Sequence, residues 1–136
     1  MKYSFTVYEK AIGKARPRYN PRARRMYTPT KTSSFEEKIR FAFLTKYNIK
    51  TELSERPFKA KITAYFAPPA STSKKKKKEL LYNIDYTKKP DVDNIAKSIL
   101  DALNGYAYKD DSQVSALLVF KNYAEENKIE IELEEI

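Results

Sequence analysis

Two pairs of aspartates are the residues of this chain whose types and spacing could do chemistry. Asp91 and Asp93 are two positions apart, directly before a helical pattern, and Asp110 and Asp111 directly precede an apolar strand pattern. Carboxylates that converge from such places repel one another unless a cation neutralises them. Because oxygen-only ligation selects a hard ion, three or four of these carboxylates indicate a site for Mg²⁺, with Mn²⁺ as a substitute.

Lys97 gives this acidic region a cation. It follows Asp93 by four residues and precedes Asp101 by four, so the three side chains share one face of the predicted helix. A bound metal ion can activate water for phosphodiester hydrolysis without a histidine, and Lys97 could hold the scissile phosphate or the attacking water. We interpret Asp101 as the salt-bridge partner of Lys97 rather than as a ligand.

A simpler interpretation stays open for each acidic pair. An Asp-x-Asp pair before a helix is often a cap whose charge interacts favourably with the helix dipole, and Asp-Asp before a strand is often a turn. Either pair alone favours that structural role. The two pairs together, with Lys97 and a basic segment elsewhere, favour a metal-dependent site.

The composition narrows the classes of partner and of chemistry. Among 136 residues, 27 Lys and Arg oppose 18 Asp and Glu, which gives a formal charge of +9. This excess favours a polyanionic partner, and nucleic acid rather than membrane, because no apolar run approaches the ~20 residues of a spanning helix. The absence of Cys and His excludes thiolate zinc sites, thiol nucleophiles and a histidine base. The N-terminus has no secretory pattern, so we expect a cytoplasmic location.

The remaining pattern predicts one small domain over residues 1–136, of α/β class and α+β type, with a mixed β-sheet and packed helices. Alternating apolar residues predict strands at 3–8, 58–66 and 128–136. The longer apolar run at 113–124 predicts a central strand that is buried on both faces along much of its length.

Two helices are expected to pack on this sheet. In the first, Ser33 and Glu36 have the spacing of a capping box, and apolar residues then recur at helical period. The second is expected to begin with Asp93 as its N-cap and to stop at Asn104. The five lysines of the run 74–78 are expected on a solvated helical face or loop, and their role is open.

The segment from Lys10 to Lys31 holds eight basic residues and no acid. Prolines interrupt it, so we predict an extended basic loop, mobile when free, that contacts DNA through Arg and Lys on phosphates and Tyr on unpaired bases. A flexible basic arm without a specific target is the alternative. The expected DNA contacts are Lys14, Arg16, Arg18, Arg22, Arg24, Arg25, Tyr27 and Lys31, together with Lys89.

Two blocks of sequence resemble a known family. The block "KPDVDNIAKSILDALNG", followed by "YKDDSQV", resembles the signature of the RusA-type Holliday junction resolvases, endodeoxyribonucleases of bacteria and their phages or prophages. The earlier block "ARPRYNPRARRMYTPTKT" resembles the basic N-terminal segment of the same family. The blocks stand in the same order as in the family, and the resemblance covers most of the chain.

The resemblance implies roles for individual residues. Asp91, Asp93 and Asp111 match the catalytic, metal-binding acids, and Lys97 matches a lysine important for cleavage. Asp110 matches the adjacent acid and is a further candidate ligand. The family implies a homodimer of mixed α/β fold that requires a divalent metal and resolves four-way DNA junctions by paired nicks, in DNA recombination and repair. The lysine run 74–78 is not part of the signature.

Two other functions are compatible with the same residues. A non-enzymatic protein that binds branched or single-stranded DNA would use the acids only as caps and turns. An RNase acting on structured RNA would share the metal chemistry, but the sequence contains no recognisable device for contacting a 2′-hydroxyl.

Overall fold

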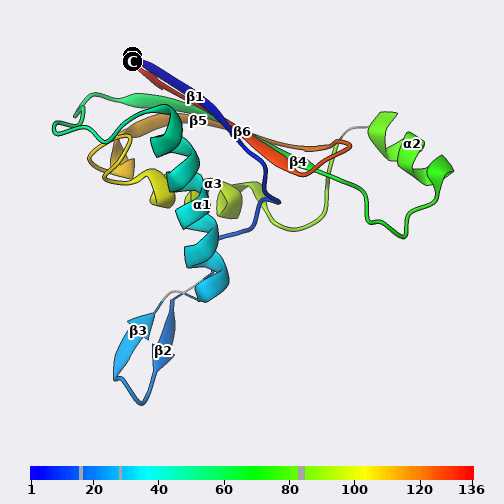
Figure 1. Ribbon diagram of the computed structural model, residues 1–136, viewed down its shortest axis with the longest axis horizontal. Coiled ribbons are helices and arrows are strands. Elements are labelled where there is room, and N and C mark those ends of the chain that lie inside the picture. The colour runs from blue at the N-terminus through cyan, green and yellow to red at the C-terminus, as the bar shows by residue number, and fades with distance from the viewer. Residues whose placement is uncertain (16, 28, 83–84) are drawn as a thin grey trace.

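The computed structural model describes residues 1–15, 17–27, 29–82 and 85–136. A mixed four-stranded sheet in the order β1-β6-β4-β5 forms the body, and a separate two-stranded sheet, β2-β3, projects from it (Figure 1). In chain order the elements are β1 (Lys2–Val7), β2 (Arg18–Asn20), β3 (Arg25–Tyr27), α1 (Thr30–Lys46), β4 (Phe58–Phe66), α2 (Lys74–Tyr82), α3 (Val92–Leu103), the short 3-10 helix η1 (Asp111–Gln113), β5 (Val114–Tyr123) and β6 (Lys128–Glu135).

Alternation of apolar and polar residues builds the core side of the sheet. In β4 every second residue from Phe58 to Phe66 is buried, and β6 buries Ile129, Ile131 and Leu133 while Glu130, Glu132 and Glu134 face the other way. The strands expected at 3–8, 58–66 and 128–136 are therefore confirmed. Strands β1, β6 and β4 pair antiparallel, whereas β4 and β5 pair parallel, so the chain through α2 and α3 forms the crossover between them.

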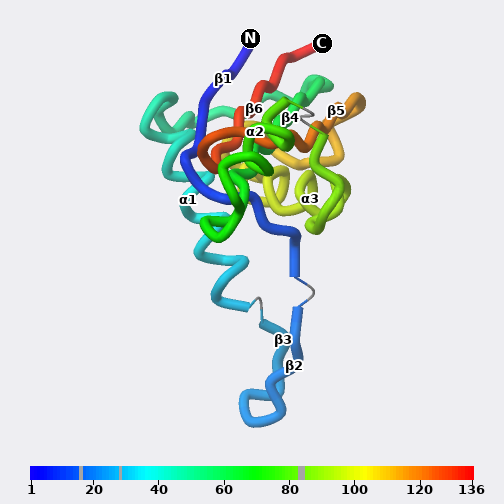
Figure 2. Tube along the Cα trace, turned by 90° about the vertical axis from the view of Figure 1, so that its right-hand side faces the viewer, coloured from blue at the N-terminus to red at the C-terminus, as the bar shows by residue number. Residues whose placement is uncertain are grey.

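Helices α1 and α3 cover one face of this sheet, and Figure 2 shows both on the same side of it. Helix α1 buries Phe35, Ile39 and Phe43 at helical spacing, as predicted. Helix α3 buries an apolar stripe that includes Ile95 and Ile99. The result is the single small α+β domain with a mixed sheet that the sequence predicts.

Strand β5 differs from its prediction. It lies at the edge of the sheet rather than in its centre, and its residues from Ser115 to Leu118 are all exposed. The apolar run was therefore wrongly interpreted as buried on both faces. The physical reason is that helices cover only one face here, and an apolar run alone does not distinguish a central strand from an edge strand.

Both predicted helix starts are also wrong. Helix α1 begins at Thr30 with Pro29 in the N-cap position, and no side chain caps it, so the expected box of Ser33 and Glu36 does not form. The fixed φ of proline is compatible with a helix entry, which moves the start one turn earlier. Helix α3 has Asp91 rather than Asp93 in the N-cap position, with extended φ and ψ of −72° and 153°, and Asp93 lies in its first turn.

The basic segment is more ordered than an extended loop. Strands β2 and β3 form an antiparallel hairpin, and the side-chain oxygen of Asn20 accepts hydrogen bonds from the backbone N–H groups of Arg22 and Ala23, at 2.9 and 3.2 Å. Arg24 completes the turn at a φ of 53°. The hairpin was not predicted because its turn contains Pro21 and no glycine.

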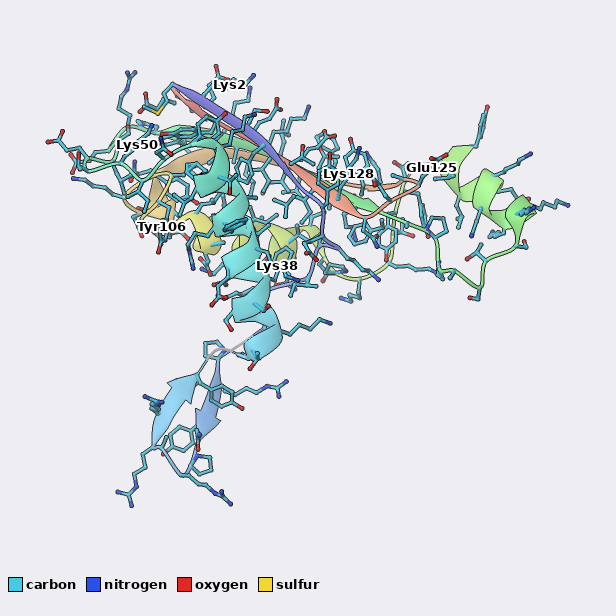
Figure 3. The ribbon with its side chains drawn as sticks, in the orientation of Figure 1. Lys2, Lys38, Lys50, Tyr106, Glu125 and Lys128 are labelled. Carbon is cyan, nitrogen blue, oxygen red and sulfur yellow. The ribbon has the colours of Figure 1, made fainter. Side chains whose placement is uncertain are left out.

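The lysine run forms α2, which buries no residue, so the expected solvated helical face is confirmed. Side chains of α2 and of the β2-β3 hairpin stand clear of the body at two different ends of the molecule (Figure 3). Within the described ranges, every helix is too short or too polar to cross a membrane.

Candidate nuclease site

A cluster of charged side chains joins α3 to the turn before β5. The ammonium of Lys97 lies 3.0 Å from an oxygen of Asp101 and 4.0 Å from an oxygen of Asp111. The ammonium of Lys14 lies 3.4 Å from the other oxygen of Asp101 and also bonds to Glu36. Two lysines and three acids from four segments of the chain therefore meet along one side of α3.

The salt bridge between Lys97 and Asp101 has the form expected from their spacing. The hydrogen bond to Asp101 raises the pKa of Lys97, with smaller contributions from Asp111 and Glu36. Lys97 therefore keeps its charge, and it remains largely exposed, so a phosphate could also reach its ammonium.

Asp111 is the acid of this cluster whose pKa is raised. Burial, and then the hydrogen bond with the Asp101 carboxyl, raise the pKa of Asp111, although Lys97 opposes the shift. Two carboxyl groups this close favour a shared cation or proton. In this structure Lys97 and Lys14 supply that positive charge to the pair.

Tyr108 lies under the cluster and does not act as a base. Its side chain is fully buried, its hydroxyl donates to the Leu100 carbonyl at 2.6 Å, and burial raises its pKa above the ordinary tyrosine value. The hydroxyl therefore stays protonated and supports the end of α3.

Asp110 is engaged in a local cap. Its carboxylate accepts from the Ser112 backbone N–H at 3.2 Å and from the Asn104 amide at 3.3 Å, while Gln113 accepts from the Asp110 backbone N–H at 2.9 Å. Hydrogen bonds from Ser112 lower the pKa of Asp110. This acid serves as the capping residue of η1, and its neighbour Asp111 is the one that turns toward α3.

Asp91 and Asp93 lie at the other end of α3. Both oxygens of Asp91 accept from the Lys89 ammonium at 2.9 Å, and Asp93 is exposed in the first turn. The ten residues from Asp91 to Asp101 correspond to about 15 Å of helix. Within the described residues no group of three acids is gathered tightly enough to hold a metal ion. The structure thus brings Lys97, Asp101 and Asp111 together, and it leaves Asp91 and Asp93 outside that contact.

The donor set nevertheless fits a hard divalent ion. All the candidate ligands are carboxylates, and the chain has no His or Cys that would favour a softer metal. Among the described residues these ligands do not converge, and lysines neutralise two of them. Asp91 has Lys89 as its partner, and Asp111 has Lys97.

Lys121 holds the loop that carries Asp91. Its ammonium donates to the carbonyl oxygens of Lys88 and Pro90 at 2.8 and 2.9 Å, and it lies 5.6 Å from the centre of the Tyr86 ring. Lys121 was not predicted as a functional residue, since nothing in its neighbourhood along the chain distinguishes it from other strand lysines. It ties the C-terminal part of β5 to the residues just before α3.

The segment after β1 packs directly on α3. Gly13 leaves little room there, since a Cβ at this position would lie 3.1 Å from the Asn94 Cβ. The Lys14 backbone N–H donates to the Asn94 carbonyl at 3.1 Å, and the Ser98 hydroxyl donates to the Ile12 carbonyl at 3.0 Å. The beginning of the basic segment is therefore fixed beside the candidate site.

The predicted DNA contacts fall into different groups. Lys14 is mostly buried and pairs with Glu36 and Asp101, so it belongs to the charged cluster rather than to a free basic surface. Lys89 is paired with Asp91. Arg16 lies outside the described residues. The other predicted contacts are exposed, most of them on the hairpin: Arg18, Arg22, Arg24, Arg25, Tyr27 and Lys31.

Comparison with known proteins gives two similarities. Residues 9–134 match the family described as "Endodeoxyribonuclease RusA". The chain is also similar to the uncharacterized protein YqaN of Bacillus subtilis strain 168, with 36% identity over 137 residues that cover 97% of this chain and 95% of the relative. The family match extends over nearly the whole domain, from just after β1 into β6.

Proposed function

The chain belongs to the RusA endodeoxyribonuclease family, and on that premise we propose that it resolves Holliday junctions as a homodimer that requires a divalent metal. Membership in this family points to an endodeoxyribonuclease that acts on branched DNA. The proposal adds the metal, the residues that hold it, and the paired nicks in opposed strands.

Asp91, Asp93 and Asp111 are the proposed ligands of Mg²⁺, with Mn²⁺ as a substitute, and Asp110 is a weaker candidate because it caps η1. A divalent ion bound there lowers the pKa of a water molecule and neutralises charge on the phosphate. Asp91 and Asp111 would hold the ion in place of their lysine partners. Lys97 would keep Asp101 as its ion-pair partner, and because its side chain is 59% exposed its ammonium could also contact the scissile phosphate.

The basic hairpin is the proposed grip on the DNA arms. Its arginines offer forked donors to phosphates, and Tyr27 offers an aromatic ring beside them. A four-way junction has approximate two-fold symmetry and must be cut twice, so a symmetric dimer with one site in each subunit suits it.

The observation that carries the proposal is the contact of Lys97 with Asp101 and Asp111 in a chain of this family. Structural capping alone does not explain it, because Asp111 comes from a different segment, is partly buried, and has a raised pKa beside a second carboxyl. Such an arrangement is typical of sites that bind a cation.

The test is cleavage of a synthetic four-way junction with Mg²⁺ or Mn²⁺. We expect the wild-type protein to nick opposed strands, and Asp91→Asn to abolish cleavage while junction binding is preserved. Forked, duplex and RNA substrates of the same length serve as controls. An intact junction with the wild-type protein, or equal cleavage of duplex and junction, would contradict the proposal.

A further inference from the structure

The two edge strands of the main sheet, β1 and β5, differ in the hydrogen bonding of their outward-facing backbone groups. At the β1 edge, the Ser4 backbone N–H donates to the Tyr47 hydroxyl at 3.0 Å, and the Ser4 carbonyl accepts from the same hydroxyl at 3.2 Å and from the Lys46 ammonium. Side chains from the end of α1 therefore occupy the backbone groups of Ser4, in the middle of β1. A strand from another molecule would meet these side chains at the centre of this edge.

The β5 edge is covered only at its two ends. The Val114 backbone N–H bonds to Asp111, while Tyr86 donates to the Lys121 carbonyl at 3.1 Å and Asp85 forms a bridge with Asn122. Between them, in the part of the chain that the structure describes, no hydrogen bond from outside the sheet reaches the backbone of residues 115–120. Alternate N–H and C=O groups of this stretch therefore face solvent.

The open stretch lacks charged residues and proline, two features that keep an edge strand from pairing with another chain. Its sequence, SALLVF, contains no charge and no proline. Leu117, Leu118 and Phe120 are 43%, 49% and 44% exposed. The one irregularity is a shift of register at its beginning, near Lys59 of the neighbouring strand, so Ala116 to Phe120 form a regular edge.

We propose that β5 pairs antiparallel with β5 of a second copy of this chain, with the two-fold axis near Leu118. The two four-stranded sheets then join into one continuous sheet of eight strands. The inference rests on the homodimer of the proposed function and names the surface that forms it.

The order of residues in β5 suits a second copy better than another partner. With Leu118 at the axis, Leu118 faces its own copy, the large Phe120 faces the small Ala116, and Leu117 faces Val119. The nearest charge, Lys121, lies opposite Ser115 and not opposite a second Lys121. Self-pairing therefore brings together complementary sizes and no like charges, whereas a polyanion finds no cation on this edge.

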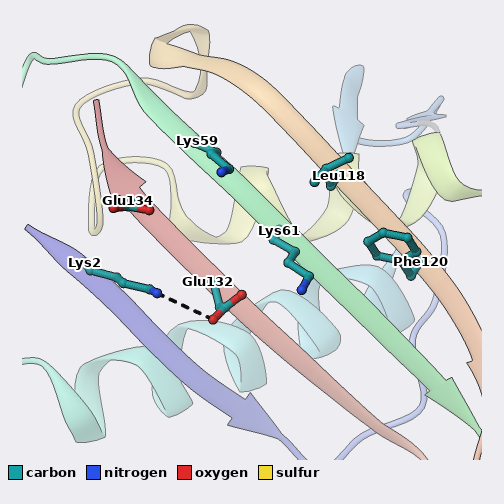
Figure 4. Close-up of a pocket in the computed structure, with 7 residues that line it drawn as sticks. All are labelled: Lys2, Lys59, Lys61, Leu118, Phe120, Glu132 and Glu134. Carbon is teal, nitrogen blue, oxygen red and sulfur yellow. Dashed lines mark ion pairs between the residues drawn. The ribbon is translucent and has the colours of Figure 1, made fainter.

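The uncovered sheet face beside the β5 edge also combines apolar side chains with neighbouring lysines. Leu118 and Phe120 line a shallow pocket of about 350 Å³ on the uncovered sheet face, next to Lys59 and Lys61 of β4 (Figure 4). The Lys61 ammonium lies 5.9 Å from the centre of the Phe120 ring. Basic residues thus flank the apolar edge without lying on it.

The proposed pairing also orients the two candidate sites. The dyad of an antiparallel strand pair is perpendicular to the sheet, so both copies of α1 and α3 lie on the same side of the joined sheet. The acids at the start of each α3 then face one side of the dimer. A substrate with approximate two-fold symmetry could contact both sites at once.

The chain has no cysteine, so single cysteines report the contact directly. Leu118→Cys is expected to give an oxidised, disulfide-linked dimer in the absence of DNA and metal, with less at Ala116→Cys and Lys121→Cys. Phe41→Cys, at a 74% exposed position on α1, and Thr6→Cys, on β1, are the controls. A linked dimer at Thr6→Cys, or none at Leu118→Cys above the Phe41→Cys background, would overturn the proposal.

Sedimentation of the protein without crosslinks gives a second measurement. Leu118→Lys is expected to weaken self-association tenfold or more, whereas Phe41→Lys leaves it unchanged and circular dichroism shows both variants folded. A wild-type protein that is monomeric, or a Leu118→Lys variant that dimerises normally, refutes the pairing. Neither experiment measures cleavage, so the interface and the nuclease function can fail independently.

Discussion

Replacing Lys121 by methionine tests whether the loop before α3 positions Asp91. Lys121 lies in β5, and its ammonium donates hydrogen bonds to the carbonyl oxygens of Lys88 and Pro90. Methionine keeps the length and apolar stem of the side chain and removes only the charge and the donors. The loop then loses its attachment to β5, while Asp91 and its neighbours keep their own side chains.

The expected loss of stability follows from the two hydrogen bonds. A bond with a charged donor contributes roughly 1.5–3 kcal/mol, but water replaces part of both here because the acceptors are partly exposed, so we expect about 1–2 kcal/mol in total. The expected loss of activity is larger. A displacement of about 1 Å at a catalytic group costs about a hundredfold in rate. We therefore expect junction cleavage to fall about a hundredfold.

The assay is single-turnover cleavage of a four-way junction, with urea unfolding and junction binding measured on the same preparations. Lys128→Met is the matched control, because Lys128 is also a strand lysine over a tyrosine ring, 5.1 Å from the centre of Tyr65, but it does not contact the loop. If Lys121→Met loses stability and cleaves at the wild-type rate, the loop does not position Asp91. If binding and cleavage fall equally, Lys121 contacts DNA instead.

Three further outcomes are expected. Lys97→Met lowers junction cleavage at least a hundredfold with binding changed only a few-fold, whereas Lys38→Met, on the exposed side of α1, cleaves normally. Replacing Arg22 and Arg24 by glutamine reduces the slope of log junction affinity against log salt concentration by about 2, because each arginine is expected to contact one phosphate. A loss of affinity without a change of this slope contradicts phosphate contact. Ile99→Ala, in the buried stripe of α3, lowers the free energy of unfolding by about 2–5 kcal/mol in urea titration, and a loss below 1 kcal/mol would mean that α3 is loosely packed.

Local spacing in the sequence was enough to predict how residues on one helix meet. The four-residue interval from Lys97 to Asp101 predicts a salt bridge on one face of α3, and the structure has it at 3.0 Å. The apolar stripe of the same helix was predicted for the same reason, because a period of 3.6 residues fixes which side chains share a face. The strands with strict alternation were predicted equally well.

Strand β5 was mispredicted because edge and centre are properties of the whole sheet. Its apolar run is long enough for a strand buried on both faces, yet helices cover only one face, and β5 has a neighbour on one side only. Information about that missing neighbour is not contained in the run itself. The pairing proposed for β5 offers a physical reason for the composition, since an apolar edge is suited to a second strand.

Partners that are distant along the chain were the other information that the sequence did not contain. Lys14 was predicted to contact DNA because it belongs to a basic run, but the packing of Gly13 against Asn94 directs it to Glu36 and Asp101. Lys121 was not singled out at all, although it holds the loop before Asp91.

Lysines beside the candidate site explain how this basic protein accommodates a cluster of aspartates. Lys89 neutralises Asp91, Lys97 and Lys14 neutralise Asp101, and Lys97 also approaches Asp111. Buried or half-buried carboxylates need such partners, and without them their mutual repulsion would destabilise the end of α3. A divalent ion placed among the acids would supply the same neutralisation with fewer groups, and the lysines it displaces would lie beside a phosphate. The same cations can therefore stabilise the free fold and, in the proposed reaction, bind the substrate.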